Sequence, residues 1–188
     1  MSENERKTWI MIKKADRTKY IDFTEQIIPL FSSANQVTNE YGTWVVSGSG
    51  ITSGSARNVF NGNTNSLARK EAGYDNSNRA YIYLTTPEGV ELSISQFEIR
   101  AKDYGYVWKA YVEAYDNTAN AWVPITEQVE TPGSLTIVPM PTTSQAYYNK
   151  FRLAFYKVSN TGATYYSCDI YNWYFKVGTM KILPPVEA

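Results

Sequence analysis

Histidine is absent from this 188-residue chain, and Cys168 is its only cysteine. Catalytic triads with a histidine base, histidine-ligated zinc sites and haem–histidine ligation are therefore excluded. A single cysteine can form neither a disulfide within the chain nor a thiolate zinc site. Because no feature near Cys168 would lower its pKa, we expect a small buried hydrophobic residue rather than a reactive thiol.

An excess of charge of one sign is also missing. The 18 basic residues balance the 18 acidic ones, so the formal net charge is zero, and no long run of like charges stands out. Nonspecific nucleic-acid binding and polybasic membrane anchoring both need a basic surface. The composition therefore argues against a nucleic-acid partner and against a membrane anchor of this kind.

Long hydrophobic runs are missing as well. No run approaches the ~20 apolar residues that a membrane-spanning helix needs. The segment from Met1 to Lys7 is polar and charged, and no apolar core of a secretory signal follows it. We expect no membrane insertion and a protein that folds in the cytoplasm where it is made. Assembly into a virus particle would be another route out of the cell.

Aromatic residues, in contrast, are abundant at 15% of the chain, with 16 tyrosines and five tryptophans. Aromatic side chains favour pleated sheets and also serve as anchors of binding surfaces. Many short alternating runs are separated by turns, and no convincing amphipathic helix is present. This pattern predicts an all-β sandwich, and the lack of an internal repeat disfavours propellers and solenoids.

Three runs carry the alternation most clearly. The run Val90–Arg100 breaks phase at Ser95-Gln96, which predicts a bulge. In the second run, Trp108, Ala110, Val112 and Ala114 should point one way, and Lys109, Tyr111, Glu113 and Tyr115 the other. The last strand should run from Cys168 to Val177, with Tyr171, Trp173, Phe175 and Val177 on one face. Arg152 should be a solvent-facing sheet residue or part of a local ion pair.

The middle of the chain carries a set of motifs. Phe60-Asn61-Gly62-Asn63 is followed by a strand, by the alternating run Ser93–Arg100, and by Tyr111–Asn117 with Trp122 beyond it. This order resembles the coagulation factor 5/8 type C family, also called discoidin or galactose-binding-like. That family reads Phe-Asp-Gly-Asp, then an alternating strand, then a Tyr-Ser-x-Asp-Gly-x-x-Trp motif.

The resemblance covers roughly residues 41–178 and implies a jelly-roll β-sandwich with its binding loops at one end. Residues 1–40 are then an N-terminal extension or attachment segment, which would include extra edge strands. Residues 179–188 are then a C-terminal tail.

Members of this family usually bind glycans, and sometimes lipid headgroups, through loops at one end of the sandwich. The corresponding loops here are 63–79, 102–107 and 159–167. Sugar recognition needs an aromatic ring for the apolar face of a pyranose and planar polar groups for its hydroxyls. The candidate ligand-binding residues are Arg69, Tyr74, Asp75, Arg79, Lys102, Tyr104, Tyr106, Tyr165 and Tyr166.

The resemblance also raises the question of calcium, because many relatives hold a structural Ca²⁺ beside the Phe-Asp-Gly-Asp turn. Here Asn61 and Asn63 replace both aspartates, and Asn172 stands near the position of a glutamate of the closing strand. Calcium prefers anionic oxygen ligands, so these neutral side chains are weak candidates. We expect no cofactor.

Several functions remain open. The first is a noncatalytic carbohydrate-binding module, acting as a phage virion adhesin on a bacterial surface glycan. The second is a structural assembly module of the virion, in which the aromatic residues contact other virion proteins and an apolar patch lies on the sheet faces or on residues 8–31. The third is an intracellular bacterial sugar-binding domain. No carboxylate lies in a catalytic motif, so an enzyme is not expected, and avidity makes a homo-oligomer a reasonable expectation.

Overall fold

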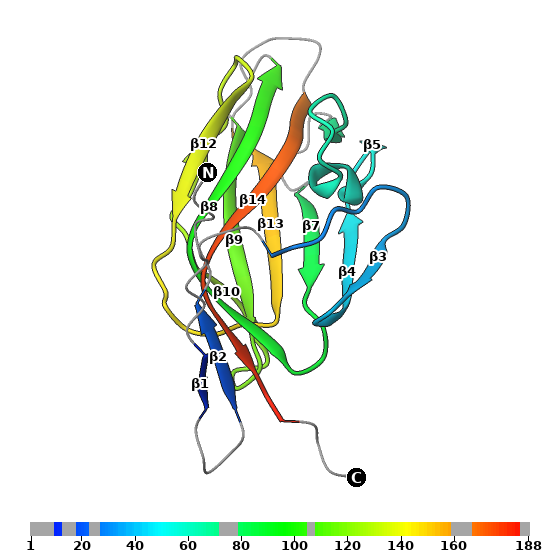
Figure 1. Ribbon diagram of the computed structural model, residues 1–188. Coiled ribbons are helices and arrows are strands. Elements are labelled where there is room, and N and C mark those ends of the chain that lie inside the picture. Colours follow the sequence, from blue (N-terminus) through cyan, green and yellow to red (C-terminus); the bar gives the residue numbers. More distant parts are fainter. Residues whose placement is uncertain are drawn as a thin grey trace, which may run out of the picture.

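A computed structural model describes residues 10–12, 18–22, 27–71, 79–104, 108–158 and 167–184. Two antiparallel sheets lie face to face as the layers of a sandwich (Figure 1). The predicted all-β sandwich is thus confirmed, and within these ranges the only helix is the 3-10 helix η1, Ala56–Phe60. In the same ranges, no helix has the length and apolar character to cross a membrane.

The first layer is built around its longest strand, β14, and is called the β14 sheet. Its strands are β1 (Ile10–Ile12), β2 (Lys19–Asp22), β5 (Ser53–Gly54), β6 (Ala68–Glu71), β8 (Val90–Tyr104), β12 (Thr136–Pro141) and β14 (Ser167–Ile182). Strand β8 follows one edge of β14, and β12 pairs with the far edge of β8. Strands β6 and β2 pair with successive parts of the other edge of β14.

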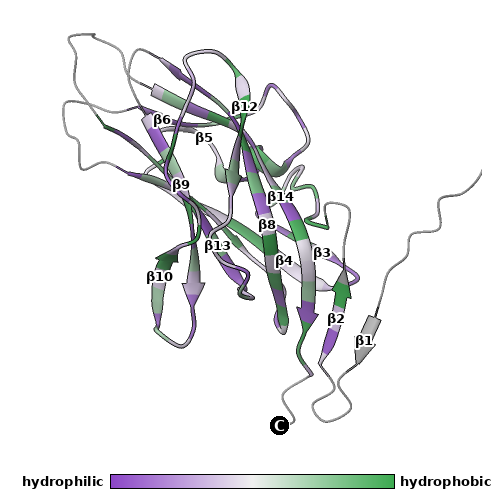
Figure 2. Cartoon of the chain, turned by 90° about the vertical axis from the view of Figure 1, so that its left-hand side faces the viewer, coloured by the Kyte–Doolittle hydropathy of each residue, from purple (hydrophilic) through white to green (hydrophobic). Residues whose placement is uncertain are grey.

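The second layer, the β13 sheet, has the order β10-β9-β13-β7-β4-β3, with β11 paired to β9. Its strands are β3 (Gln36–Asn39), β4 (Gly42–Ser49), β7 (Ala80–Thr85), β9 (Trp108–Asp116), β10 (Ala121–Pro124), β11 (Val129–Glu130) and β13 (Lys150–Lys157). Along most strands, hydrophilic and hydrophobic residues alternate (Figure 2). This is the pattern of sheets that bury one face against each other.

The bulge predicted in β8 is present. Gln96 lies opposite Lys176 and Ile94 lies opposite Val177, so Ser95 has no partner in the register. The extra residue shifts the phase, and both Ile94 and Phe97 can therefore turn toward the core.

A second bulge corrects the prediction for β14. Ile170 pairs with Ala101 and Asn172 pairs with Arg100, which leaves Tyr171 as an extra residue. Trp173, Phe175 and Val177 are buried as predicted, but Tyr171 lies on the outer face. The prediction that all four share one face is wrong, because the bulge reverses the alternation after Ile170. The strand also continues past Val177 to Ile182.

The centre of the core is a group of aromatic rings from both sheets and from η1. Phe97 lies 4.8 Å from Phe175, and Phe151 of the opposite sheet lies 5.5 Å from Phe175, as distances between ring centroids. Trp173 is fully buried and lies 5.6 Å from Phe60 at the end of η1. Tilted and edge-on contacts at these distances add to the hydrophobic gain from burial.

Parts of the segment before residue 41 are built into this sandwich. Strand β2 pairs with the last residues of β14, and β3 pairs with β4. Ile28 and Phe31 are buried in the core, and Phe31 lies 5.8 Å from Phe60. These residues supply edge strands and core side chains, while the role of residues 1–40 as an attachment segment stays a prediction.

Replacing Trp173 with alanine should lower the free energy of unfolding by about 3–5 kcal/mol, because the ring leaves a large cavity between Phe60, Phe97 and Phe175. The measurement is urea denaturation. Tyr174→Ala, the next residue on the half-buried outer face, is the matched control and should cost less than about 1 kcal/mol. Equal effects of the two substitutions would contradict this view of the core.

Candidate functional site

The three predicted binding loops leave from one end of the sandwich. Strand β6 ends at Glu71, β8 ends at Tyr104 and β14 begins at Ser167, and Ser167 is the register partner of both other residues. On the second sheet, β7 and β9 begin and β13 ends at the same level, through the pairs Phe155–Ala80 and Lys157–Trp108. The topology therefore brings the bases of these loops together.

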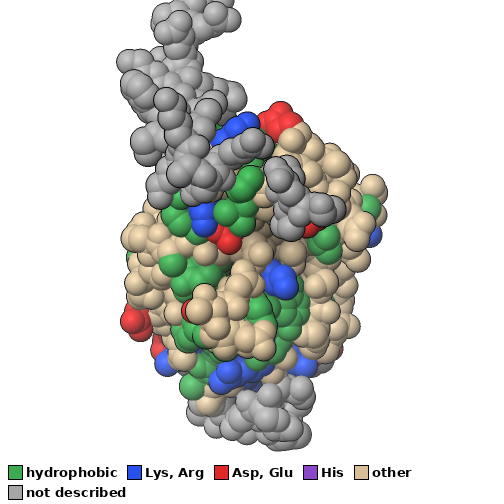
Figure 3. All heavy atoms as spheres, turned by 90° about the horizontal axis from the view of Figure 1, so that it is seen from below, with side chains coloured by type: hydrophobic (Ala, Val, Ile, Leu, Met, Phe, Trp, Pro, Cys, Tyr) green, Lys and Arg blue, Asp and Glu red, His purple; other side chains and the backbone are tan. Residues whose placement is uncertain are grey.

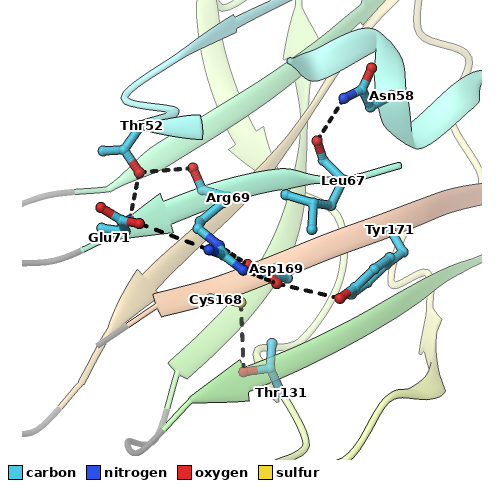
Figure 4. A network of polar contacts seen from close by, with 9 residues as sticks. All are labelled: Thr52, Asn58, Leu67, Arg69, Glu71, Thr131, Cys168, Asp169 and Tyr171. Carbon is cyan, nitrogen blue, oxygen red and sulfur yellow. Dashed lines mark hydrogen bonds and ion pairs between the residues drawn. The ribbon is translucent and has the colours of Figure 1, made fainter. Parts of the chain in front are cut away.

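A group of polar and aromatic residues lies beside that end, on the outer face of β6, β8 and β14. We call it the end cluster; its members are Arg69, Lys102, Tyr104, Asp169 and Tyr171. Arg69 donates from Nε to Oδ1 of Asp169 at 2.6 Å and from its NH2 group to Oδ2 at 2.8 Å (Figure 4). Because Asp169 is fully buried, this bidentate pair fixes the guanidinium in one orientation.

Tyr104 lies between two cations of the end cluster. The guanidinium carbon of Arg69 is 5.7 Å from the ring centroid of Tyr104, and Nζ of Lys102 is 4.4 Å from it. Tyr171 donates from its hydroxyl to Oδ2 of Asp169 at 3.4 Å. The side chains of Arg69, Lys102, Tyr104 and Tyr171 are all partly exposed, so the cluster presents an aromatic ring and two cations to solvent.

The surroundings shift the pKa of two members of the end cluster, Arg69 and Tyr171. The hydrogen bond to Asp169 raises the pKa of Arg69, so its guanidinium stays charged. Burial, then the hydrogen bond with Tyr104 and the charge of Asp169, raise the pKa of Tyr171 to about 12. At neutral pH Arg69 is therefore a charged donor and Tyr171 a neutral phenol.

The structure brings together three of the predicted residues, Arg69, Lys102 and Tyr104, and separates Arg79 from them. Arg79 lies on the β13 sheet, with its guanidinium 4.8 Å from the ring centroid of Tyr156 and a 2.8 Å hydrogen bond to the hydroxyl of Tyr111. The other predicted residues, Tyr74, Asp75, Tyr106, Tyr165 and Tyr166, lie outside the described residues.

Two members of the end cluster were not among the predicted binding residues. Asp169 was missed because its partner Arg69 is 100 positions away in the sequence. Tyr171 was placed on the same face as Trp173, Phe175 and Val177 because the bulge was not anticipated. A signal for Asp169 was present, since a carboxylate next to buried Cys168 and Ile170 needs a cation.

Arg152 makes the local ion pair that was one of its two predicted environments, and it does so among aromatic rings. Its Nε donates to Oε2 of Glu113 at 2.6 Å. The guanidinium carbon lies 4.6 Å from the ring centroid of Tyr81 and 4.5 Å from that of Trp122. The buried thiol of Cys168 also agrees with its prediction, and burial raises its pKa.

The turn at Phe60-Asn61-Gly62-Asn63 does not fit Ca²⁺. Oδ1 of Asn61 accepts the backbone N–H of Asn63 at 2.8 Å, and Oδ1 of Asn63 accepts that of Asn65 at 2.9 Å. A cation already contacts the turn, because Arg100 donates to the carbonyl oxygen of Thr64 at 3.3 Å. A neutral donor set beside a guanidinium is a poor calcium site. In the described ranges, no three His, Cys, Asp or Glu side chains gather into a metal-binding group.

Neither a protein-family model nor a curated protein matches the sequence. Solved structures match the fold. The family 32 carbohydrate-binding module of C. perfringens NanJ, in complex with galactose, has a TM-score of 0.52 at 10% identity, over 75% of this chain and 97% of that chain. An F5/8 type C domain from Bacteroides fragilis has a TM-score of 0.52 at 12% identity, over 76% and 97%. The module CpGH89CBM32-5 from Clostridium perfringens, in complex with GalNAc-β-1,3-galactose, has a TM-score of 0.50 at 12% identity, over 70% and 94%.

The protein is therefore a discoidin-like β-sandwich. It has the fold of the F5/8 type C domains and family 32 carbohydrate-binding modules, as its motifs predicted.

A double-mutant cycle on Arg69 and Asp169 should give a coupling free energy of about 2 kcal/mol, since one partner is fully buried and the other reaches solvent. The alanine variants would be compared in urea denaturation. The control cycle uses the more exposed pair Lys176–Glu98 of the same sheet, where less than about 1 kcal/mol is expected. Similar couplings in both cycles would refute the special role of the buried pair.

Adding 5 mM CaCl₂, or removing metal with a chelator, should leave the melting temperature within about 1 °C, because a ligand stabilises a protein only if it binds the folded state. Differential scanning fluorimetry measures this. A rise of several degrees with calcium alone, and not with magnesium, would show that the turn binds the ion after all.

Proposed function

We propose that this protein is a noncatalytic carbohydrate-binding module that contacts its glycan through the end cluster. The observation that carries the proposal is the ring of Tyr104 between Arg69 and Lys102, beside the buried carboxylate of Asp169. The fold likeness supports it, since two of the structural neighbours were solved with galactose and with GalNAc-β-1,3-galactose.

The chemistry of the end cluster suits a sugar. The ring of Tyr104 offers a flat surface for the apolar face of a pyranose, and aromatic side chains provide such area at low entropic cost. Arg69, held by Asp169, would donate to hydroxyl oxygens from a fixed position. Lys102 adds a more adaptable donor. A cation that is already fixed next to a ring loses little conformational entropy when a ligand binds.

The described part of the cluster lacks the pair of carboxylates that glycoside hydrolysis uses. Asp169 is fully buried and both of its oxygens accept from Arg69. Burial raises the pKa of Asp103, but this residue alternates with Lys102 and Tyr104 along β8 and contacts Thr131 at 3.4 Å instead. Binding without catalysis is therefore the better proposal.

At a finer level, our hypothesis is a phage virion adhesin that recognises a bacterial surface glycan, alone or as a homo-oligomer. The alternative of a virion assembly module predicts an apolar patch on the sheet faces or on residues 8–31. The exposed large aliphatic residues of the described ranges are Leu135 and Ile137 at the start of β12, with Leu30, Val158 and Leu183 in three other segments. On the end shown in Figure 3, hydrophobic side chains are interspersed with charged and polar ones. A glycan array separates the two hypotheses, because only the adhesin should bind a defined subset of glycans.

A glycan array tests the proposal. The wild-type protein should bind a defined subset of glycans, and Tyr104→Ala and Lys102→Ala should each weaken that binding at least about fivefold while leaving the melting temperature unchanged. The matched controls are Tyr174→Ala and Lys176→Ala, which lie on the outer face of the same sheet toward the other end of β14. Silence across the array, or equal losses in the control variants, would reject binding through the end cluster.

A further inference from the structure

The outer face of the β13 sheet carries a group of aromatic residues. We call this surface the aromatic face; its rings belong to Tyr81, Tyr83, Tyr111, Tyr115, Trp122 and Tyr156. Four neighbouring strands, β7, β13, β9 and β10, supply them. The small residue Ala154 of β13 is the register partner of Tyr81 on β7 and of Tyr111 on β9. Ala154 itself is fully buried.

The rings of this face contact one another in a row. Trp122 lies 5.4 Å from Tyr115 and 5.8 Å from Tyr83, both in edge-on geometry. Tyr83 lies 6.0 Å from Tyr81. Each ring is thus held by the next, and a ligand would meet a surface that needs little ordering.

Arg152 fixes the centre of the row. Its guanidinium lies between the rings of Tyr81 and Trp122, and Glu113, which is only 7% exposed, holds it through a 2.6 Å hydrogen bond. Guanidinium groups stack on aromatic faces, and a paired carboxylate orients the planar fork. The ion pair neutralises the centre and leaves Tyr81 and Trp122 in defined orientations.

Two more cations lie toward the two ends of this face, and neither forms an ion pair with a carboxylate of the described residues. At one end, Nζ of Lys150 is 5.1 Å from the ring centroid of Tyr115. At the other end, Arg79 covers the ring of Tyr156. Six residue steps on β13 separate Lys150 from Tyr156, a span of roughly 20 Å.

Lys109 also lies at the Arg79 end, opposite Glu130 in the register of β9 and β11. Cations thus outnumber carboxylates on this face, although the whole chain is neutral.

We propose that the aromatic face binds an acidic polysaccharide chain laid along the strands. The apolar faces of its sugar rings stack on Tyr81, Trp122 and Tyr115, and its carboxylates lie near Lys150 and Arg79. Carboxylates separated by several sugar units match cations that stand at the two ends of a neutral aromatic centre.

The charge distribution fits other occupants less well. Single-stranded nucleic acid carries a phosphate at every nucleotide and needs cations all along its track, whereas the centre here is neutralised by Glu113. A protein partner that docks on an apolar patch fits less well, because this face is partly polar. The hydroxyl of Tyr83 forms a hydrogen bond with the hydroxyl of Ser49 at 3.3 Å, and the hydroxyl of Tyr156 donates to Gln128 at 2.8 Å.

This surface is separate from the end cluster, which lies on the outer face of the opposite sheet. The two proposals therefore stand or fall independently. Variants of the end cluster should not affect the aromatic face, and the reverse also holds.

Isothermal titration calorimetry with gellan oligosaccharides, whose carboxylates are separated by several neutral sugar units, tests the proposal, with dextran oligosaccharides of equal length as the neutral probe. The full chain should bind the gellan oligosaccharides and not dextran, and the affinity should fall as NaCl rises from about 50 mM to about 500 mM. Trp122→Ala should lower the affinity at least about tenfold, and Lys150→Gln about threefold. Tyr174→Ala and Lys176→Ala, on the other sheet, should leave it unchanged.

Melting temperatures of all variants identify any loss caused by unfolding, and the surface variant Lys150→Gln keeps the test decisive if Trp122→Ala is unstable. The proposal is overturned by equal affinity for dextran, by no binding of the gellan oligosaccharides, or by tighter binding of an oligo(dT) probe. It is equally overturned if light scattering shows an oligomer of the wild type that Trp122→Ala dissociates.

Discussion

The pairing of β14 with β8 is the constraint on which the rest of the structure depends. The two strands pair from Ser167 and Tyr104 at one end to Ile182 and Val90 at the other, and each other strand of that sheet takes a place relative to them. Every backbone group of such a long ribbon needs a partner, so the register is held along its whole length. Irregularities within it are therefore the places where the molecule can redirect side chains. The bulge at Tyr171 is one of them, and it puts a phenol beside Asp169 on the outer surface.

Alternation along single strands predicted the sandwich and the bulge in β8, and the family resemblance predicted that Arg69, Lys102 and Tyr104 lie at one end. These features follow from local periodicity and from motif order, both of which a sequence displays. The bulge at Tyr171 could not be predicted, since it is defined by the partner strand and not by the residues around it. For a similar reason, Asp169 was missed and Arg79 was grouped with residues that lie on the other sheet. Their surroundings are set by strands distant in sequence, and a position next to a predicted loop does not determine the sheet to which a side chain belongs.

The same arrangement of an ion pair beside a tyrosine ring occurs on both outer faces of the sandwich. Arg69 with Asp169 on one sheet, and Arg152 with Glu113 on the other, each combine a buried carboxylate with a guanidinium beside a tyrosine ring. Ion pairs of this kind contribute less to stability than their distances suggest, because desolvation offsets much of the attraction. Their clearer effect is orientation. A cation held in one place can serve a ligand without being ordered first.

The position of Trp122 has an optical consequence. Of the four tryptophans in the described ranges, Trp44, Trp108 and Trp173 are fully buried, and Trp122 alone is half-buried against Arg152 and Tyr115. Three indoles should thus emit from a constant apolar surrounding, while the fourth senses changes in polarity at one surface. Among these four tryptophans, the emission of Trp122 would therefore report what approaches the β13 sheet, without any added label.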